Sequence, residues 1–213
     1  MDLKIFNSFS LKIIMVILMV LDHIAQFIPG SPLWFHWIGR LVAPIFFFLL
    51  TEGYEHTRDR RVYMRRLFTW AGIMFIGNFI IWLIFRRESF IINNIFFSMA
   101  LGIALLIALE NENRNKLIIF IILLLSTFAE GSIISIAMVL IFHYLKEDKL
   151  KMSLAYMAIS ATFIPNYQWM MVFSLPFIWM YNGKRGKNIK YFFYFFYPIH
   201  IWILYIIGYY IEK

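Results

Sequence analysis

The sequence has no cysteine among its 213 residues and few charges, since Asp, Glu, Lys and Arg together make up 15% of the chain. The missing cysteine excludes disulfide bonds, thiolate metal ligands and a cysteine nucleophile. The low charge accompanies a hydrophobic fraction of 62%, well above the ~45–50% of soluble domains. The composition therefore predicts an all-α, polytopic integral membrane helical bundle, because helices satisfy the backbone hydrogen bonds inside a bilayer.

Apolar runs close to the ~20 residues that cross a ~30 Å hydrocarbon core indicate nine transmembrane helices. The runs lie at about 11–28, 34–53, 67–85, 91–109, 117–129, 131–145, 152–165, 168–181 and 191–211. Several later runs are short, so eight or ten spans are alternatives. The first run lacks a small-residue cleavage site and is expected to be retained. Short linkers and the absence of repeats favour a single transmembrane domain over 1–213.

The basic residues are concentrated on one side of the predicted membrane. With the N-terminus in the cytosol, sixteen of the twenty Lys and Arg residues fall in inner segments, and the outer segments hold Arg86, Arg87 and Lys213. This bias follows the positive-inside rule. We therefore expect a multi-pass protein of the bacterial cytoplasmic (inner) membrane with its C-terminus outside. The same bias accounts for the net charge of +8, so the lipid bilayer is a predicted partner and nucleic acid is not.

Four ionisable residues lie away from the ends of their apolar runs, where they are costly and by default mark function. Asp22 and His23 are adjacent near the end of the first run, Arg40 lies in the second, and His200 lies in the last. His23 and His200 are expected at a similar depth and can line one cavity. A neutral imidazole there can act as a general base. Asp22 can orient that ring or, because helix neighbours point about 100° apart, pair with Arg40. A hydrogen bond between helices is the alternative for each histidine.

A dense group of charged residues begins at the end of the second run. Its members that suit a phosphate-rich ligand or its orientation are Glu52, His56, Arg58, Arg61, Arg65 and Arg66. Arginine forks match phosphate oxygens. A topology signal and an anchor for lipid headgroups are the alternatives. Glu52 and His56 share a helical face, but two ligands do not make a metal site, so no metal is predicted.

Other polar residues have simpler interpretations. His36 and His143 lie near helix ends and receive no role. Glu130, in a short turn, is expected to be solvated, and Asn93 with Asn94 is expected to start the fourth helix. Pro198 removes a backbone donor two residues before His200, which favours a position for His200 facing protein or a cavity rather than lipid.

Four stretches carry a resemblance to a known family. They are MVLDH at 19–23, GRLVAPIFFFLLTEGYEHTRDRRVYMRRL at 39–67, NNIFFSMALG at 93–102 and KYFFYFFYPIH at 190–200. Together they cover about a third of the chain. They resemble the TraX-like transmembrane acyltransferases, which are distantly related to the heparan-α-glucosaminide N-acetyltransferases.

The resemblance implies acetyl transfer from cytosolic acetyl-CoA, as co-substrate, to an amine on a sugar, peptide or antibiotic. His23 would be the general base, and Asp22, Arg40 and His200 would complete the catalytic group. Arg40 or an asparagine would stabilise the oxyanion that forms when the thioester is attacked, and His200 would orient the thioester or the acceptor. The arginine cluster would hold the CoA phosphates, and Lys190 and Tyr197 of the last motif join the cofactor-binding candidates.

Two functions of other classes compete with this enzyme. A proton-coupled small-solute transporter would use Asp22, His23, Arg40 and His200 as a relay. A lipid-binding scaffold would use the arginines for headgroups. The acceptor and the oligomeric state are left open by the sequence.

Overall fold

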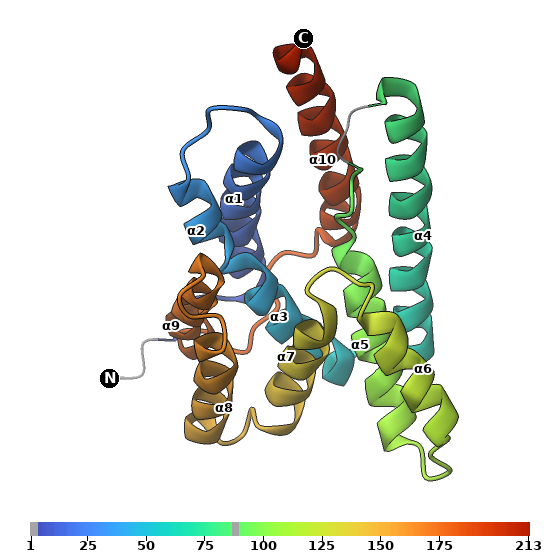
Figure 1. The fold of residues 1–213 in the computed structure, drawn as a ribbon. Helices are drawn as coiled ribbons and strands as arrows, with labels where there is room; N and C mark the ends of the chain where they lie inside the picture. Colours follow the sequence, from blue (N-terminus) through green and yellow to red (C-terminus); the bar gives the residue numbers. More distant parts are fainter. Residues whose placement is uncertain (1–3, 87–89) are drawn as a thin grey trace. The chain divides into compact units, whose positions relative to one another are not determined.

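The computed structural model of the protein describes residues 4–86 and 90–213, and within these ranges the chain forms helices and no β-strand (Figure 1). The helices are α1 (Ser8–Phe27), α2 (Trp34–Gly39), α3 (Val42–His56), α4 (Arg60–Phe85), α5 (Ile95–Glu110), α6 (Lys116–Ser126), α7 (Ser132–Tyr144), α8 (Lys149–Ala161), the 3-10 helix η1 (Tyr167–Ser174), α9 (Leu175–Trp179) and α10 (Lys190–Glu212). Each of the nine predicted apolar runs contains helix, which confirms the all-α fold class. Arg87 and the side chain of Lys190 lie outside what the structure describes.

Asparagine side chains begin several of these helices. Asn7 accepts a hydrogen bond from the backbone of Ser10, whose hydroxyl accepts one from the backbone N–H of Asn7, so α1 starts with a reciprocal capping box. Asn94 accepts from Phe97 N at the start of α5. The expectation that this asparagine starts the fourth predicted span is therefore confirmed, although the helix begins four residues later than the apolar run.

The second predicted span is two helices rather than one. α2 ends at Gly39, α3 begins at Val42, and residues 40 and 41 form a turn between them. The physical reason is Pro44, which has no N–H to donate to the carbonyl of Arg40 four residues earlier, and whose ring would collide with that carbonyl in a continuous helix. Arg40 is consequently at a helix break and not within a helix.

Glu130 is not the solvated residue expected from the sequence. Its carboxylate accepts a hydrogen bond of 2.7 Å from the backbone N–H of Asn94, and its backbone carbonyl accepts one from the hydroxyl of buried Ser98. The turn before α7 is thereby fastened to the start of α5. The prediction failed because the five residues between α6 and α7 form a turn whose side chains can still meet a neighbouring helix.

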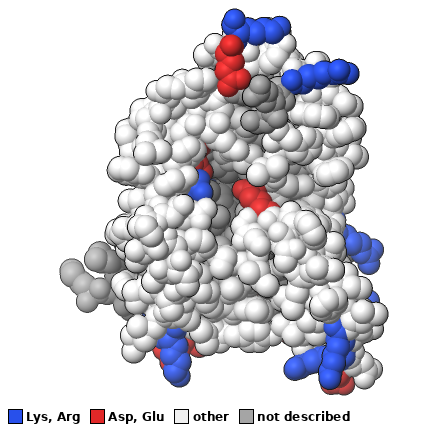
Figure 2. All heavy atoms as spheres, viewed as in Figure 1, with Lys and Arg blue, Asp and Glu red and all other residues white. Residues whose placement is uncertain are grey.

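Helix length and surface composition support a membrane protein. Four segments of the described chain are long and apolar enough to cross a membrane: Ser8–Phe27, Trp34–His56, Arg60–Phe85 and Tyr191–Glu212. α4 exposes large apolar side chains on much of its surface, namely Ile73, Phe75, Ile76, Phe79, Ile80, Leu83 and Ile84. On the face drawn in Figure 2, most of the surface carries neither acidic nor basic side chains. α5, α6 and α7 are apolar but shorter.

The contacts divide the chain into two compact units. Unit 1 contains residues 1–46, 80–90 and 156–213, and in it α1 packs against α2 and α10, while η1 contacts α2 and α9. Unit 2 contains residues 47–79 and 91–155, and in it α5, α6 and α7 pack on one another. The apolar core of unit 2 includes Leu101, Leu105, Ile122 and Ile136. The histidines of interest lie in unit 1 and the arginine cluster lies in unit 2.

Candidate functional site

His23 on α1 and His200 on α10 contact each other inside unit 1. The two side chains are buried, with 5% and 8% of their residue surface exposed, and Nδ1 of His23 lies 2.8 Å from Nε2 of His200. The ring of Tyr197 meets both imidazoles edge-on, at 6.2 Å and 5.9 Å between centroids. The structure therefore brings together three of the residues that the sequence singled out.

A backbone carbonyl fixes the proton positions in this pair. Nδ1 of His200 lies 2.7 Å from the carbonyl oxygen of Phe196, and because a carbonyl only accepts, this nitrogen carries the hydrogen. A neutral imidazole has one donor and one acceptor, so Nε2 of His200 accepts and Nδ1 of His23 donates. The remaining nitrogen, Nε2 of His23, then has a free lone pair, and it has no hydrogen-bond partner among the described residues.

Local sequence explains how His200 is held. α10 continues through Pro198, which leaves the carbonyl four residues earlier without its helical donor. The ring of Phe196, one helical turn before His200, stacks on the His200 imidazole with 4.8 Å between ring centroids and an interplanar angle of 16°. Stacking and the Nδ1 hydrogen bond together restrict the imidazole to one orientation.

Asp22 faces a different partner from its neighbour His23. Its carboxylate accepts two hydrogen bonds from Nη2 of Arg40, at 2.6 and 2.7 Å, and lies 2.7 Å from Nδ1 of His36. The pairing of Asp22 with Arg40 that the sequence allowed is thus what the structure shows, whereas an orienting contact from Asp22 to His23 is not what it shows. The reason is the ~100° rotation between successive helical residues, which aims Asp22 at α2 and His23 at α10.

The backbone of α2 approaches Asp22 closely at Gly39. A Cβ placed on Gly39 would lie 2.4 Å from both Cβ and Cγ of Asp22, so only glycine fits here without a shift. Arg40 Nε also donates to the carbonyl oxygen of His36 at 3.0 Å. The helix break described above places Arg40 where it can make both contacts.

His36 was assigned no role from the sequence, yet it belongs to this group. A signal for it does exist in the chain, because the turn IPGSP at 28–32 separates α1 from α2, and Asp22 and His36 are seven residues on either side of Pro29. In an antiparallel helix pair, residues equidistant from the turn face one another. Tyr167 of η1 was also missed; its ring stacks on that of His36 at 6.0 Å.

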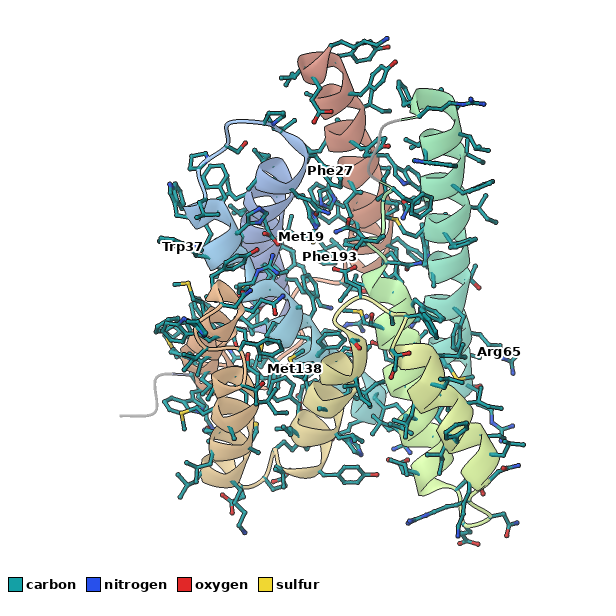
Figure 3. All side chains as sticks on the ribbon, viewed as in Figure 1. Met19, Phe27, Trp37, Arg65, Met138 and Phe193 are labelled. Carbon is teal, nitrogen blue, oxygen red and sulfur yellow. The ribbon has the colours of Figure 1, made fainter. Side chains whose placement is uncertain are left out.

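The arginine cluster lies in unit 2 at the end of α3 and the start of α4. Arg58, Arg61 and Arg65 are exposed, and none forms an ion pair with another residue in the described part of the chain. Figure 3 shows Arg65 pointing outward from α4. Arg66 lies over the ring of Tyr63, at 5.3 Å from its centroid. The guanidinium groups of Arg58, Arg61 and Arg65 are suited to an anionic ligand.

The other two candidates of the same stretch, Glu52 and His56, have partners within the protein. Glu52 lies 3.8 Å from Nζ of Lys146, and Nδ1 of His56 donates to the carbonyl oxygen of Glu52 at 2.8 Å. The His56 side chain thus contacts the backbone of Glu52 and not its carboxylate. The described residues include no group of three or more His, Cys, Asp or Glu side chains placed to hold a metal ion.

A polar network that sequence reasoning missed joins four helices of unit 2. Glu110 at the end of α5 accepts from buried Tyr54 at 2.8 Å, contacts Arg60, and lies 3.1 Å from Nε2 of His143. Arg60 also covers the Tyr54 ring at 4.3 Å. Glu55 lies 3.5 Å from Nδ1 of His143 and pairs with Lys146. These contacts tie α3, α4, α5 and α7 together, and nothing in the sequence spacing indicates them.

Comparisons with known proteins agree with the motifs. The family described as TraX protein matches residues 8–208. A relative from Dichelobacter nodosus, named probable fimbrial assembly protein FimC, serogroup H1, is 28% identical, with the match covering 93% of this chain and 94% of the relative. No solved structure matches the chain. Because the family match runs from the start of α1 almost to the end of α10, the chain belongs to the TraX family.

Proposed function

We propose that this protein is an integral membrane N-acetyltransferase that transfers the acetyl group of acetyl-CoA to an amine. The observation that carries the proposal is the buried His23–His200 pair, whose tautomers leave Nε2 of His23 unprotonated. A positioned neutral imidazole is the commonest general base for acyl transfer. The family membership and its resemblance to transmembrane acyltransferases support the same chemistry.

His23 and His200 have different tasks in this proposal. His23 Nε2 takes the proton as the amine attacks the thioester carbonyl, and the resulting cation is stabilised through Nδ1–H by His200. His200 is a positioning residue, because it acts on the substrate only through His23. The expectation that His200 orients the thioester or acceptor directly is therefore replaced by an action on the base. The charge of Arg40 is compensated by Asp22, so we assign Arg40 to holding that carboxylate and not to an oxyanion.

The cofactor phosphates are assigned to the exposed arginines of unit 2. Coenzyme A carries a phosphate and a pyrophosphate, and guanidinium forks bind such oxygens in pairs. Arg58, Arg61 and Arg65 have no competing carboxylate among the described residues, and Arg66 adjoins them. Glu52 is excluded from phosphate contact by its own charge and by its pairing with Lys146.

The acceptor is proposed to be an amine on a sugar, peptide or antibiotic. The relative from Dichelobacter nodosus is named as a fimbrial assembly protein, which is compatible with a peptide amine on an assembled subunit. We further propose nine spans in a bacterial inner membrane with the N-terminus in the cytosol, since sixteen of twenty basic residues then lie inside. The shorter helices of 11–16 residues would span about 16–24 Å.

Proton-coupled transport is the second candidate, and the same hydrogen bond favours it. His23 and His200 in contact can pass a proton between α1 and α10 without covalent chemistry. A transporter would move protons in liposomes and would not release free thiol from acetyl-CoA.

The deciding experiment measures thiol release from acetyl-CoA by the purified protein in detergent, with an amine such as glucosamine present. We expect amine-dependent release for the wild type and a loss of ~10²- to 10⁴-fold for His23→Gln, with acetyl-CoA binding retained. A wild-type protein that binds no acetyl-CoA and releases no thiol, yet carries protons in proteoliposomes, would refute the enzyme and support the transporter.

A further inference from the structure

Asp22 and His36 form a second imidazole site in unit 1. Oδ1 of Asp22 lies 2.7 Å from Nδ1 of His36, and because a carboxylate only accepts, Nδ1 carries the hydrogen. In the neutral ring Nε2 is then the free base. The side chain of His36 is 22% exposed, so this nitrogen can be reached by a ligand more readily than that of His23.

The surroundings of His36 hold the ring rigidly. Arg40 donates to both carboxylate oxygens of Asp22 and to the carbonyl oxygen of His36. Tyr167 stacks on the imidazole at 6.0 Å and an interplanar angle of 16°, and Arg40 lies 5.8 Å from the centroid of the same tyrosine ring. A carboxylate that orients an imidazole and stabilises its cation is the arrangement that general bases use.

His36 and Arg40 both contact Asp22, which is the neighbour of His23 in α1. Two imidazoles with free Nε2 atoms therefore occupy one region of unit 1, each held through its Nδ1–H by a different acceptor. If the imidazoles of His23 and His36 both act in one reaction, that reaction must have a use for two bases.

Acetylation of an amine supplies that reason, since two protons leave the nitrogen. The acceptor is an ammonium ion, which must lose one proton before its lone pair can attack the thioester carbon. The new C–N bond forms as the carbonyl π electrons move to oxygen, and the nitrogen then loses its second proton. When the C–S bond breaks, the sulfur takes up one proton, and the other is released to solvent. The products are an amide, free CoA thiol and one proton.

We propose that His36, oriented by Asp22, is a second general base, which removes the first proton from the acceptor ammonium ion. The partly exposed His36 passes that proton to solvent, and the buried His23 retains the second proton and returns it to the sulfur. The inference rests on the proposed acetyltransferase function and adds to it that the acceptor enters as a protonated amine beside α2.

Two acceptor amines test this division. Ethanolamine is almost wholly protonated at neutral pH, whereas hydroxylamine is almost wholly neutral and does not need the first deprotonation. For His36→Gln we expect acetyl transfer to ethanolamine to fall ~10²-fold or more while transfer to hydroxylamine changes less than about threefold. His23→Gln should lower both. Asp22→Asn, which keeps an acceptor but removes the charge, should follow His36→Gln with a smaller loss.

Each outcome decides between the two proposals. A wild type that acetylates neither amine refutes the acetyltransferase function and this inference with it. Equal losses for the two amines in His36→Gln refute the second base and leave the function standing. If the variants do not fold, diethyl pyrocarbonate, which acylates neutral imidazole, is applied to the wild type. Ethanolamine transfer should then fall as the His36 peptide is modified, and loss of that activity with His36 unmodified overturns the inference.

Discussion

His200 makes two hydrogen bonds, one with His23 and one with the Phe196 carbonyl, and two substitutions of His200 test them separately. In His200→Asn the amide lies near the position of Nδ1, so it still donates to the Phe196 carbonyl but offers no acceptor to His23. In His200→Gln the longer side chain places an amide oxygen near the position of Nε2, where it accepts from Nδ1–H of His23. One variant thus keeps the contact to the backbone and the other keeps the contact to the base.

The size of the effect follows from the buried donor that His200→Asn leaves behind. An unsatisfied buried N–H costs about 1–3 kcal/mol, and at about 1.36 kcal/mol per factor of ten this shifts the tautomer of His23 away from Nδ1–H by about 5- to 150-fold. Turnover should fall by the same factor, since Nε2 then carries the hydrogen. For His200→Gln we expect a loss of less than about fivefold, because the required tautomer keeps its acceptor.

Nitrogen-15 NMR of histidine-labelled protein in nanodiscs measures the tautomers independently of activity. We expect the Nδ1–H form for both His23 and His200 in the wild type, retention of that form for His23 in His200→Gln, and the Nε2–H form for His23 in His200→Asn. Finding His23 as Nε2–H in the wild type would refute the reasoning. Equal turnover of the Asn and Gln variants would refute the assignment of His200 as a positioning residue.

Three further predictions concern other parts of the molecule. Replacing Arg58 and Arg65 by Ala should weaken acetyl-CoA binding, measured by calorimetry, more than it weakens the binding of CoA that lacks the 3′-phosphate. If the variant binds each ligand as tightly as the wild type does, the phosphates bind elsewhere. Gly39→Ala should destabilise the protein by about 1–3 kcal/mol, because the new Cβ would meet Asp22 at 2.4 Å. Gly72→Ala, whose new Cβ would have nothing within 4 Å, should leave the melting temperature unchanged or raise it. Equal shifts of the melting temperature in the two variants would contradict the close approach at Gly39. Alkaline phosphatase should be active when fused after Lys213 and inactive after Tyr63, and the reverse would overturn the orientation.

Helices and their starts were predictable because their causes are local. Apolar runs determine where a chain can be helical in a bilayer, and the asparagine before α5 satisfies N–H groups that lie within three residues of it. The break between α2 and α3 has an equally local cause in Pro44. The break was missed because the mean hydropathy of a run does not change when a single backbone N–H group is absent.

Contacts between distant helices were not predictable in the same way. Glu110 and Tyr54 are 56 residues apart, and their hydrogen bond depends on how α3 and α5 pack in unit 2. His143 and Glu55 meet for the same reason. Glu55, Glu110 and His143 lie at or near helix ends, and a helix end near the aqueous boundary tolerates charge whether or not it has a partner.

The adjacent pair Asp22 and His23 shows how one local feature becomes two sites. A rotation of ~100° between successive residues sends the carboxylate to α2 and the imidazole to α10, so each side chain meets a histidine from a different helix. The two meetings are chemically complementary. Asp22 supplies His36 with a carboxylate acceptor that also pairs with Arg40, and the partly exposed His36 can pass a proton to solvent. His200 supplies His23 with a neutral imidazole acceptor in a buried place, which suits a base that must keep its proton from solvent and give it back within the same turnover.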